Sequence, residues 1–120
     1  MVSRARRDAE HRGRRAEWIA QTWLRLKGYS ILATRFKRPI GEIDIIARRG
    51  QMLVFIEVKQ RPTIAAAQDA VPDLAWERIA RTAQIWSAAY PAMQMLDWRF
   101  DLIAVNAKGF PKHFRDYWRP

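Results

Sequence analysis

The run from Met52 to Gln60 constrains the fold more than any other part of this chain, because it is the most apolar segment. An apolar run of strand length that is followed by Pro62 predicts a strand in the middle of a sheet, covered on both faces. Covering both faces requires helices on either side of that sheet. Glu57 and Lys59 lie inside this run, and buried charged groups cost free energy unless they are paired or bind a ligand.

The other elements are predicted from helical periodicity, strand runs and turn residues. One helix is expected to run from the arginine-rich first segment to Lys27, ended by Gly28, and another from an N-cap at Asp73 to about Ala89. Strands are expected at residues 30–36, 42–48, 52–60 and 98–105, a short helical turn within 63–72, and a fifth strand or a terminal turn at 112–117. The order α-β-β-β-α-β predicts one α/β domain, spanning residues 1–120, with a mixed central β-sheet flanked by helices.

Some side chains are assigned an environment by their position in these elements. The helix that begins at Asp73 is expected to bury one face, made of Leu74, Ile79, Ala83, Trp86 and Tyr90. His11 and His113 have no partner at metal-ligand spacing, so both are expected at the surface. Asp101 interrupts an apolar strand, which a salt bridge to an arginine explains as well as a catalytic role does.

The composition excludes several classes of protein. The chain has no cysteine, which rules out disulfides, zinc–thiolate sites and thiol nucleophiles. Its longest unbroken apolar run, residues 52–56, is far shorter than the roughly 20 residues of a membrane-spanning helix. The N-terminal arginines are not followed by an apolar stretch, so this segment is not a secretory signal. We therefore expect a cytoplasmic protein with no membrane partner.

The formal net charge is +10, and it is concentrated at the start of the chain. Residues 1–38 hold eleven basic and three acidic residues, whereas residues 39–120 hold eleven basic and nine acidic ones. This asymmetry predicts a nucleic-acid partner, with a solubilising arginine tail as the alternative. The charge does not distinguish DNA from RNA, of which DNA is the expected partner. Residues 1–12 are expected to form a flexible basic arm. The candidate contacts with nucleic acid are Arg14, Arg15, Arg35, Lys37, Arg38 and Arg61.

Two acids and a lysine are predicted to meet on one face of a hairpin. Alternate side chains of a strand share a face, so Glu57 and Lys59 point the same way. A two-residue turn at residues 49–50 would place Asp44 opposite Phe55, on that face and diagonal to Glu57. Asp44 and Glu57 could then share one Mg²⁺ or Mn²⁺ ion, the cations that oxygen ligands favour. Lys59 would orient the attacking water or neutralise charge on a phosphate, which points to phosphodiester hydrolysis.

Four segments carry a resemblance to a known family: GRRAE at 13–17, GEIDIIA at 41–47, LVFIEVKQR at 53–61 and RFDLIAV at 99–105. With these segments the chain resembles the YraN-type bacterial proteins over nearly its whole length. That family is grouped with the PD-(D/E)xK restriction-endonuclease-like nucleases, and within that group it is most similar to archaeal Holliday-junction resolvases. The resemblance implies a restriction-endonuclease-like sheet and, if the substrate is a junction, a homodimer. It also implies a catalytic set of Glu17, Asp44, Glu57 and Lys59, with Asp44 and Glu57 as metal ligands.

Two departures from the family pattern leave three hypotheses open. Residues 62–67 replace a loop that usually contains serine, glycine and phenylalanine, and Ala75 stands where a lysine is usual. The first hypothesis is a Mg²⁺- or Mn²⁺-dependent endonuclease that hydrolyses phosphodiester bonds, with branched DNA as a candidate substrate. The second is a nucleic-acid-binding module that kept the nuclease scaffold without turnover. The third is an interaction protein whose basic segment binds an acidic partner.

Overall fold

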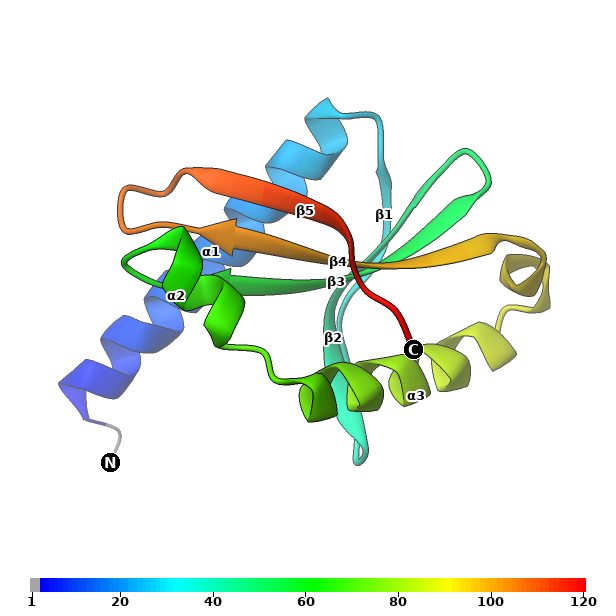
Figure 1. Cartoon of the computed structure of the whole chain (residues 1–120), viewed down its shortest axis with the longest axis horizontal. Helices are drawn as coiled ribbons and strands as arrows, with labels where there is room; N and C mark the ends of the chain where they lie inside the picture. The colour runs from blue at the N-terminus through cyan, green and yellow to red at the C-terminus, as the bar shows by residue number, and fades with distance from the viewer. Residues whose placement is uncertain (1–2) are drawn as a thin grey trace.

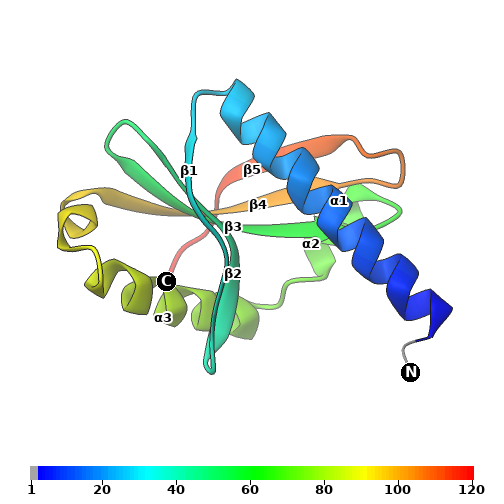
Figure 2. The same ribbon diagram turned by 180° about the vertical axis from the view of Figure 1, so that it is seen from behind.

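The computed structural model describes residues 3–120 and shows a mixed sheet with helices on both faces (Figure 1). The helices are α1 (Arg4–Leu26), α2 (Ile64–Asp69) and α3 (Asp73–Ala88), with a 3-10 helix, η1, at Pro91–Met95. The strands are β1 (Ser30–Arg38), β2 (Gly41–Arg49), β3 (Met52–Gln60), β4 (Asp97–Val105) and β5 (Pro111–Trp118). Figure 2 shows α1 crossing the face of the sheet opposite to α3. The predicted α/β fold with a mixed central sheet is confirmed.

The strands lie side by side in the order β1-β2-β3-β4-β5. The first three form an antiparallel meander, β4 is parallel to β3, and β5 is antiparallel to β4. A parallel pair needs a long crossover, which α2, α3 and η1 provide. β3 is the central strand, and all its residues from 53 to 58 are buried. The prediction that this strand is covered on both faces is therefore confirmed.

Each face of the sheet has its own apolar core. On the α3 face, the ring of Phe55 lies 5.1 Å from Trp98, 5.5 Å from Phe100 and 6.3 Å from Trp86, measured between ring centres. On the α1 face, the small inner side of the helix packs against branched residues of the strands, namely Ile45, Val54, Ile56, Val58, Ile103 and Val105. The strands β2 to β4 are thus held from both sides.

Helix α1 ends where the sequence predicts, and its first residue is set by a capping serine. The side chain of Ser3 accepts a hydrogen bond from the N–H of Arg6 at 3.2 Å, and Gly28 ends the helix with a φ of +87°. Residues 4–12 of the predicted basic arm belong to this helix and are exposed, whereas residues 1–2 lie outside the described part of the chain. No helix within residues 3–120 is both long and apolar enough to cross a membrane.

Helix α3 differs from its prediction in its N-cap and in the extent of its buried face. Pro72, not Asp73, is the N-cap, and Asp73 is the first helical residue. Leu74 is 59% exposed and Tyr90 is 50% exposed, so placing them on the buried face was wrong. Leu74 lies two positions from the buried Trp76, which is about 200° around a helix, and Tyr90 follows the helix end. The predicted burial of Ile79, Ala83 and Trp86 is confirmed.

The β2–β3 hairpin uses a different turn from the predicted one. Arg49 pairs with Met52, so Gly50 and the residue after it form the turn, with a φ of +60° at Gly50. Phe55 pairs with Ile46, and the prediction that it faces Asp44 was wrong. The turn moves because a left-handed backbone is strained for most residues but not for glycine. The register shifts by two positions, which brings Glu57 closer to Asp44 than the diagonal arrangement expected.

The strands β4 and β5 bury a charged network that corrects one expectation and confirms another. The side chain of His113 is only 1% exposed, so its predicted surface position was wrong. Its Nε2 lies 2.7 Å from Oδ2 of Asp101, a carboxylate that also receives two hydrogen bonds from Arg99 at 2.8 Å. The expected salt bridge of Asp101 to an arginine is confirmed. Strand pairing supplies the contact, because it sets His113 beside Ile103, two residues from Asp101.

Candidate active site

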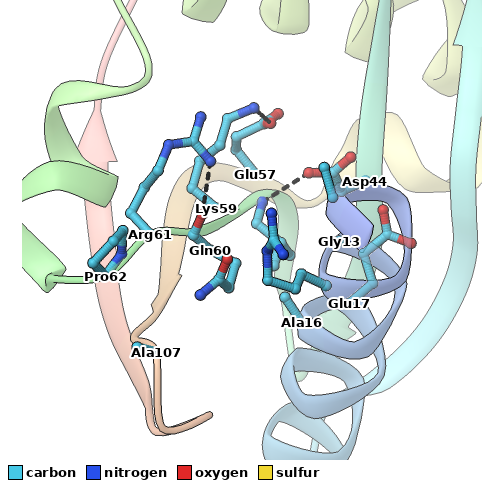
Figure 3. Close-up of a pocket in the computed structure, with 13 residues that line it drawn as sticks. Gly13, Ala16, Glu17, Asp44, Glu57, Lys59, Gln60, Arg61, Pro62 and Ala107 are labelled. Atoms are coloured by element: carbon cyan, nitrogen blue, oxygen red, sulfur yellow. Dashed lines mark hydrogen bonds and ion pairs between the residues drawn. The ribbon is translucent and has the colours of Figure 1, made fainter. Parts of the chain in front are cut away.

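A cavity of about 820 Å³ lies between the first half of α1 and the ends of β2 and β3 (Figure 3). Helix α1 supplies one wall, β2 contributes a single acid, and β3 with the residues after it supplies the opposite wall. The lining residues are Ala9, Arg12, Gly13, Ala16, Glu17, Asp44, the run from Glu57 to Pro62, and Ala107. All four residues predicted to be catalytic, Glu17, Asp44, Glu57 and Lys59, therefore border one cavity.

Asp44 reaches this cavity because the regular pairing of β2 with β3 stops beside it. The paired residues run from Arg49 with Met52 to Ile45 with Ile56. Beyond that point the N–H of Val58 donates to Oδ2 of Asp44 at 2.8 Å. A side chain has thus taken the place of a main-chain acceptor, and Figure 3 shows the Asp44 carboxyl directed at the β3 backbone.

The backbone also departs from regular alternation at Asp44. Its neighbours Ile43 and Ile45 pack into the cores on opposite faces of the sheet, although residues two apart in a regular strand share a face. On the adjacent strand β1, Arg35 has a φ of +50°. We conclude that Asp44, Glu57 and Lys59 share a cavity, as predicted, but that a local twist brings Asp44 there rather than strict alternation.

Glu57 and Lys59 lie two residues apart on β3 and form an ion pair, with Nζ of Lys59 3.2 Å from Oε1 of Glu57. The glutamate side chain is 11% exposed and the lysine side chain is 30% exposed. The ammonium group is therefore open to the cavity, while the carboxylate it contacts is largely withdrawn from solvent. This arrangement gives one cation for two buried acids.

Burial makes both acids of the pair hold a proton more strongly than a free carboxylate does. Burial, followed by the negative charge of Glu57, raises the pKa of Asp44 to about 8, against the opposing hydrogen bond from the Val58 N–H. Burial also raises the pKa of Glu57, and the charge of Lys59 opposes that rise. At neutral pH the pair therefore retains a proton, which a divalent cation would displace.

The donor set at this point fits a hard divalent cation. Within residues 3–120 no three side chains of histidine, cysteine or acids are grouped as a ligand set, so Asp44 and Glu57 would be the protein ligands. Mg²⁺ commonly binds to one or two carboxylates and takes its other ligands from water and phosphate. Two neighbouring carboxylates that border an open cavity meet that requirement.

Glu17 is the acid that α1 contributes, and it is bound to a residue predicted to contact nucleic acid. Its Oε2 accepts a hydrogen bond from Nε of Arg35 at 2.7 Å, while the side chain of Arg35 stays 49% exposed. Glu17 therefore links the first helix to β1 at the cavity edge. Arg35 therefore lies next to the site, with its charge already paired with that of Glu17.

The other predicted nucleic-acid contacts are spread over a wider surface. Arg61 lines the cavity, with one guanidinium nitrogen donating to the carbonyl of Gln60 at 2.7 Å. Arg14 and Arg15 are exposed on α1, and Arg15 borders a second, narrow pocket beside Gly109. Lys37 and Arg38 end β1, at the hairpin to β2, and do not line the cavity.

Sequence reasoning missed two features of the α1 wall, the cation Arg12 and the small residues beside it. Ala9, Gly13 and Ala16 all line the cavity, and no atom lies within 4 Å of a Cβ built on Gly13. Their spacing of four and three residues places them on one side of a helix. That spacing in the sequence could have indicated an open wall of small residues.

The two departures from the family pattern lie close to this site. Glu57 and Lys59 also border a smaller cavity of about 220 Å³ on the α3 side, which Ala75 and Arg78 line. Arg78 therefore places a cation about one helical turn along α3 from Ala75. In the altered segment 62–67, Thr63 caps α2 by accepting a hydrogen bond from the N–H of Ala66 at 3.1 Å.

Comparison with known proteins places these residues in a family. The model of a family described as "Uncharacterised protein family UPF0102" matches residues 16–105, which include all four predicted catalytic residues. A UPF0102 protein of Maricaulis maris is 48% identical over 119 residues, covering 99% of this chain and 94% of the relative. A UPF0102 protein of Chelativorans is 48% identical over 109 residues, covering 91% and 88%. One of Rhizobium johnstonii is 46% identical over 111 residues, covering 92% and 91%.

Proposed function

The chain belongs to the uncharacterised protein family UPF0102, and we propose that it is a metal-dependent endonuclease with the cavity between α1, β2 and β3 as its active site. The family is the one that the resemblance to the YraN-type proteins indicated. Its grouping with the PD-(D/E)xK nucleases, and the restriction-endonuclease-like description of the sheet, are part of this proposal.

The observation that carries the proposal is the pair of buried carboxylates with a single lysine. Asp44 and Glu57 are both largely withdrawn from solvent, the pKa of each is raised, and Lys59 is the cation that contacts Glu57. Two neighbouring carboxylates that are withdrawn from solvent destabilise the fold when both are charged, and they favour the binding of a divalent cation. Mg²⁺ or Mn²⁺ bound there would supply a more acidic water and positive charge beside a phosphate.

The protein's own residues have separate tasks in this proposal. Asp44 and Glu57 hold the cation, and the hydrogen bond from the Val58 N–H fixes the orientation of Asp44. Lys59 projects its ammonium into the cavity, where it can hydrogen-bond to a phosphate oxygen or to the attacking water. Arg12 and Arg61 stand on opposite walls of the cavity and can bind the phosphates on either side of the one that is cleaved.

The second candidate is a nucleic-acid-binding module without turnover. Ala75 removes the cation that the family usually has at the start of α3, which would weaken phosphate binding on that side. Arg78 lines the same small cavity and can replace that charge, so we favour the enzyme. The third candidate, an interaction protein with an acidic partner, would use the acids only in structural pairs with Lys59 and Arg61, but Arg61 donates to the Gln60 carbonyl instead.

The test is cleavage of labelled linear, flapped and four-way-junction DNA by the purified chain, with Mg²⁺, Mn²⁺ or a chelator. We expect metal-dependent nicking that falls by at least about 100-fold in Glu57→Gln and in Lys59→Ala, while binding survives. Glu77→Gln, a change at an exposed acid of α3, is the matched control and should cut normally. If the chain binds nucleic acid but nicks none of the substrates, the endonuclease proposal is wrong and the binding module is favoured. If it binds no nucleic acid even at low salt, the interaction protein is favoured.

The preferred substrate also predicts the oligomeric state of the protein. Symmetric cuts in a four-way junction need two active sites, and hence a homodimer with one cavity in each subunit. Preference for the junction over the flapped and linear substrates should therefore be accompanied by a dimer in light scattering. A monomer that cuts all three substrates equally would remove the junction from the proposal and leave the endonuclease in place.

A further inference from the structure

The outer side of α1, which faces away from the sheet and the cavity, carries a continuous basic stripe. Its residues follow one another at intervals of three, four or seven along the helix, which places them in one line. The members of this basic stripe are Arg4, Arg7, His11, Arg14, Trp18 and Arg25, and all of them are exposed. At about 1.5 Å of rise per residue the stripe is roughly 30 Å long.

The stripe is separate from the active-site cavity. Trp18 lies two positions from Ala16 and two from Ala20, both of which are buried against the sheet. Two positions correspond to about 200° around a helix, so Trp18 points away from the sheet. None of the six stripe residues lines the cavity. A strand bound along the stripe would therefore not occupy the site that we propose for cleavage.

The charges of the stripe are not neutralised by the described part of the chain. Among the arginines of α1, Arg6 is the one that forms an ion pair within residues 3–120. Its Nε lies 3.9 Å from Oε1 of Glu10, and neither residue belongs to the stripe. The acids of this helix, Asp8, Glu10 and Glu17, are not members of the stripe. An uncompensated row of guanidinium groups is complementary to a row of phosphates.

Trp18 is the unusual member of the stripe, because it is 66% exposed. The other tryptophans have partners: Trp23 lies under Lys27 at 4.5 Å, Trp76 stacks on Trp118 at 6.1 Å, and Trp86 and Trp98 contact Phe55. An exposed indole between arginines offers a flat face on which an unpaired base can stack. Bases inside a duplex are already stacked and cannot reach such a ring on a helix surface.

We propose that the basic stripe of α1 binds a single-stranded segment of nucleic acid, with its arginines on the phosphates and Trp18 stacked on an unpaired base. A second copy of the chain is a poor occupant, because two such stripes would repel each other. The inference goes beyond the proposed endonuclease, since binding at the stripe needs neither the metal nor Lys59. It identifies nucleic acid with an unpaired strand as the preferred ligand.

The experiment measures binding of a short labelled single-stranded oligonucleotide by fluorescence anisotropy in chelator, so that cleavage plays no part. Trp18→Ala should weaken binding about tenfold, which is the size expected for the loss of one stacked base. It should have little effect on a duplex of the same sequence, or on a single strand of the same length with abasic sites. Alanine favours the helix, so the variant should fold. Leu74→Ala, which changes an exposed apolar residue of α3, is the matched control.

The arginines are tested in the same assay. Arg14→Glu should weaken binding to intact and abasic strands alike and should reduce its salt dependence, because a phosphate contact is lost. Arg81→Glu, at an exposed arginine of α3, controls for the change in net charge. The proposal is overturned if Trp18→Ala leaves single-strand binding unchanged or weakens abasic and intact strands equally. Equal displacement of the oligonucleotide by polyglutamate would instead favour an acidic protein as the partner.

Discussion

Asp101 is a buried aspartate of the sheet and Asp44 is a half-buried one, and the protein treats their charges in opposite ways. Asp101 has two hydrogen bonds from Arg99, a contact with His113 at 2.7 Å and the N–H of Asp116 at 2.9 Å. Burial alone would raise its pKa, but these partners bring the pKa of Asp101 below its usual value. Asp44 has one N–H and a second acid, and its pKa rises to about 8.

The contrast separates a structural acid from one that is available for function. The charge of Asp101 is compensated inside the chain by Arg99 and His113. Arg99 also donates to the hydroxyl of Tyr29 at 2.7 Å, which ties β4 to the segment between α1 and β1. The charges of Asp44 and Glu57 are compensated only in part, by Lys59. The first arrangement stabilises the fold by itself, and the second favours a cation from outside the chain.

The largest expected effect follows from removing the compensated acid. Asp101→Ala should lower the free energy of unfolding at pH 7 by about 3–5 kcal/mol, because it leaves Arg99 and His113 buried without their partner. Since the pKa of Asp101 is lowered, its contribution is present above the unfolded value near 4 and is lost as the pH falls below it. Urea unfolding at neutral and acidic pH measures both the loss of stability and its dependence on pH. Glu77→Ala, at an exposed acid of α3, is the control, and an equal loss in both variants would contradict the comparison.

Removing the charge of Asp44, the uncompensated acid, should raise the free energy of unfolding rather than lower it. Asp44→Asn should stabilise the metal-free protein by about 1–3 kcal/mol near pH 8, because asparagine can still accept from the Val58 N–H without the charge. The raised pKa means that the wild type loses stability from about pH 4 up to about 8, so the gain should grow across that range and then level off.

Urea unfolding in chelator at pH 5 and pH 8 tests this expectation. Asp73→Asn, at an exposed acid in the first turn of α3, is the control and should show no such rise with pH. Destabilisation by Asp44→Asn at pH 8 would mean that the carboxylate is compensated after all, and the contrast with Asp101 would disappear.

A divalent cation should stabilise the protein through Asp44 and Glu57, and not through Asp101. Mn²⁺ at about 10 to 100 times its dissociation constant should raise the stability of the wild type by about 1–3 kcal/mol, seen as a higher Tm. The shift should be larger at pH 8 than at pH 6, because the cation must displace the proton held by the pair. Glu57→Gln should abolish the shift, whereas Asp116→Ala should keep it. An unchanged shift in Glu57→Gln would place the cation elsewhere.

The smallest expected effect concerns the open wall of the cavity. Gly13→Ala should stabilise the protein by about 0.5–1 kcal/mol, because glycine is a poor helix former and the added Cβ meets no atom within 4 Å. Gly41→Ala is the contrasting control, since its Cβ would lie 2.8 Å from Oγ1 of Thr82 and should destabilise. Thermal melting compares the two. A destabilised Gly13→Ala would show that this wall is packed rather than open.

The candidate site was predictable in its members but not in its construction. Glu57 and Lys59 were found because charge inside an apolar strand is costly wherever that strand is buried, and β3 has the bounds that its sequence predicts. Asp44 was found although its predicted pairing was wrong, because the true turn at Gly50 brings it nearer to Glu57. The hydrogen bond to Val58 and the twist beside Asp44 could not be predicted, because they depend on two cores that pull Ile43 and Ile45 to opposite faces.

Local chemistry in the sequence determined the elements of this protein: the apolar run made β3 central, Gly28 ended α1, and the early arginines made that helix basic. These properties depend on residues close together in the chain, whose preferences need no partner. Tertiary structure alone decided which charges are compensated. His113 meets Asp101 through strand pairing, and Asp44 meets Glu57 through the hairpin and the twist. Compensation depends on burial and on distances of a few ångströms between elements, and a sequence does not specify these until the sheet and its two helical layers are assembled.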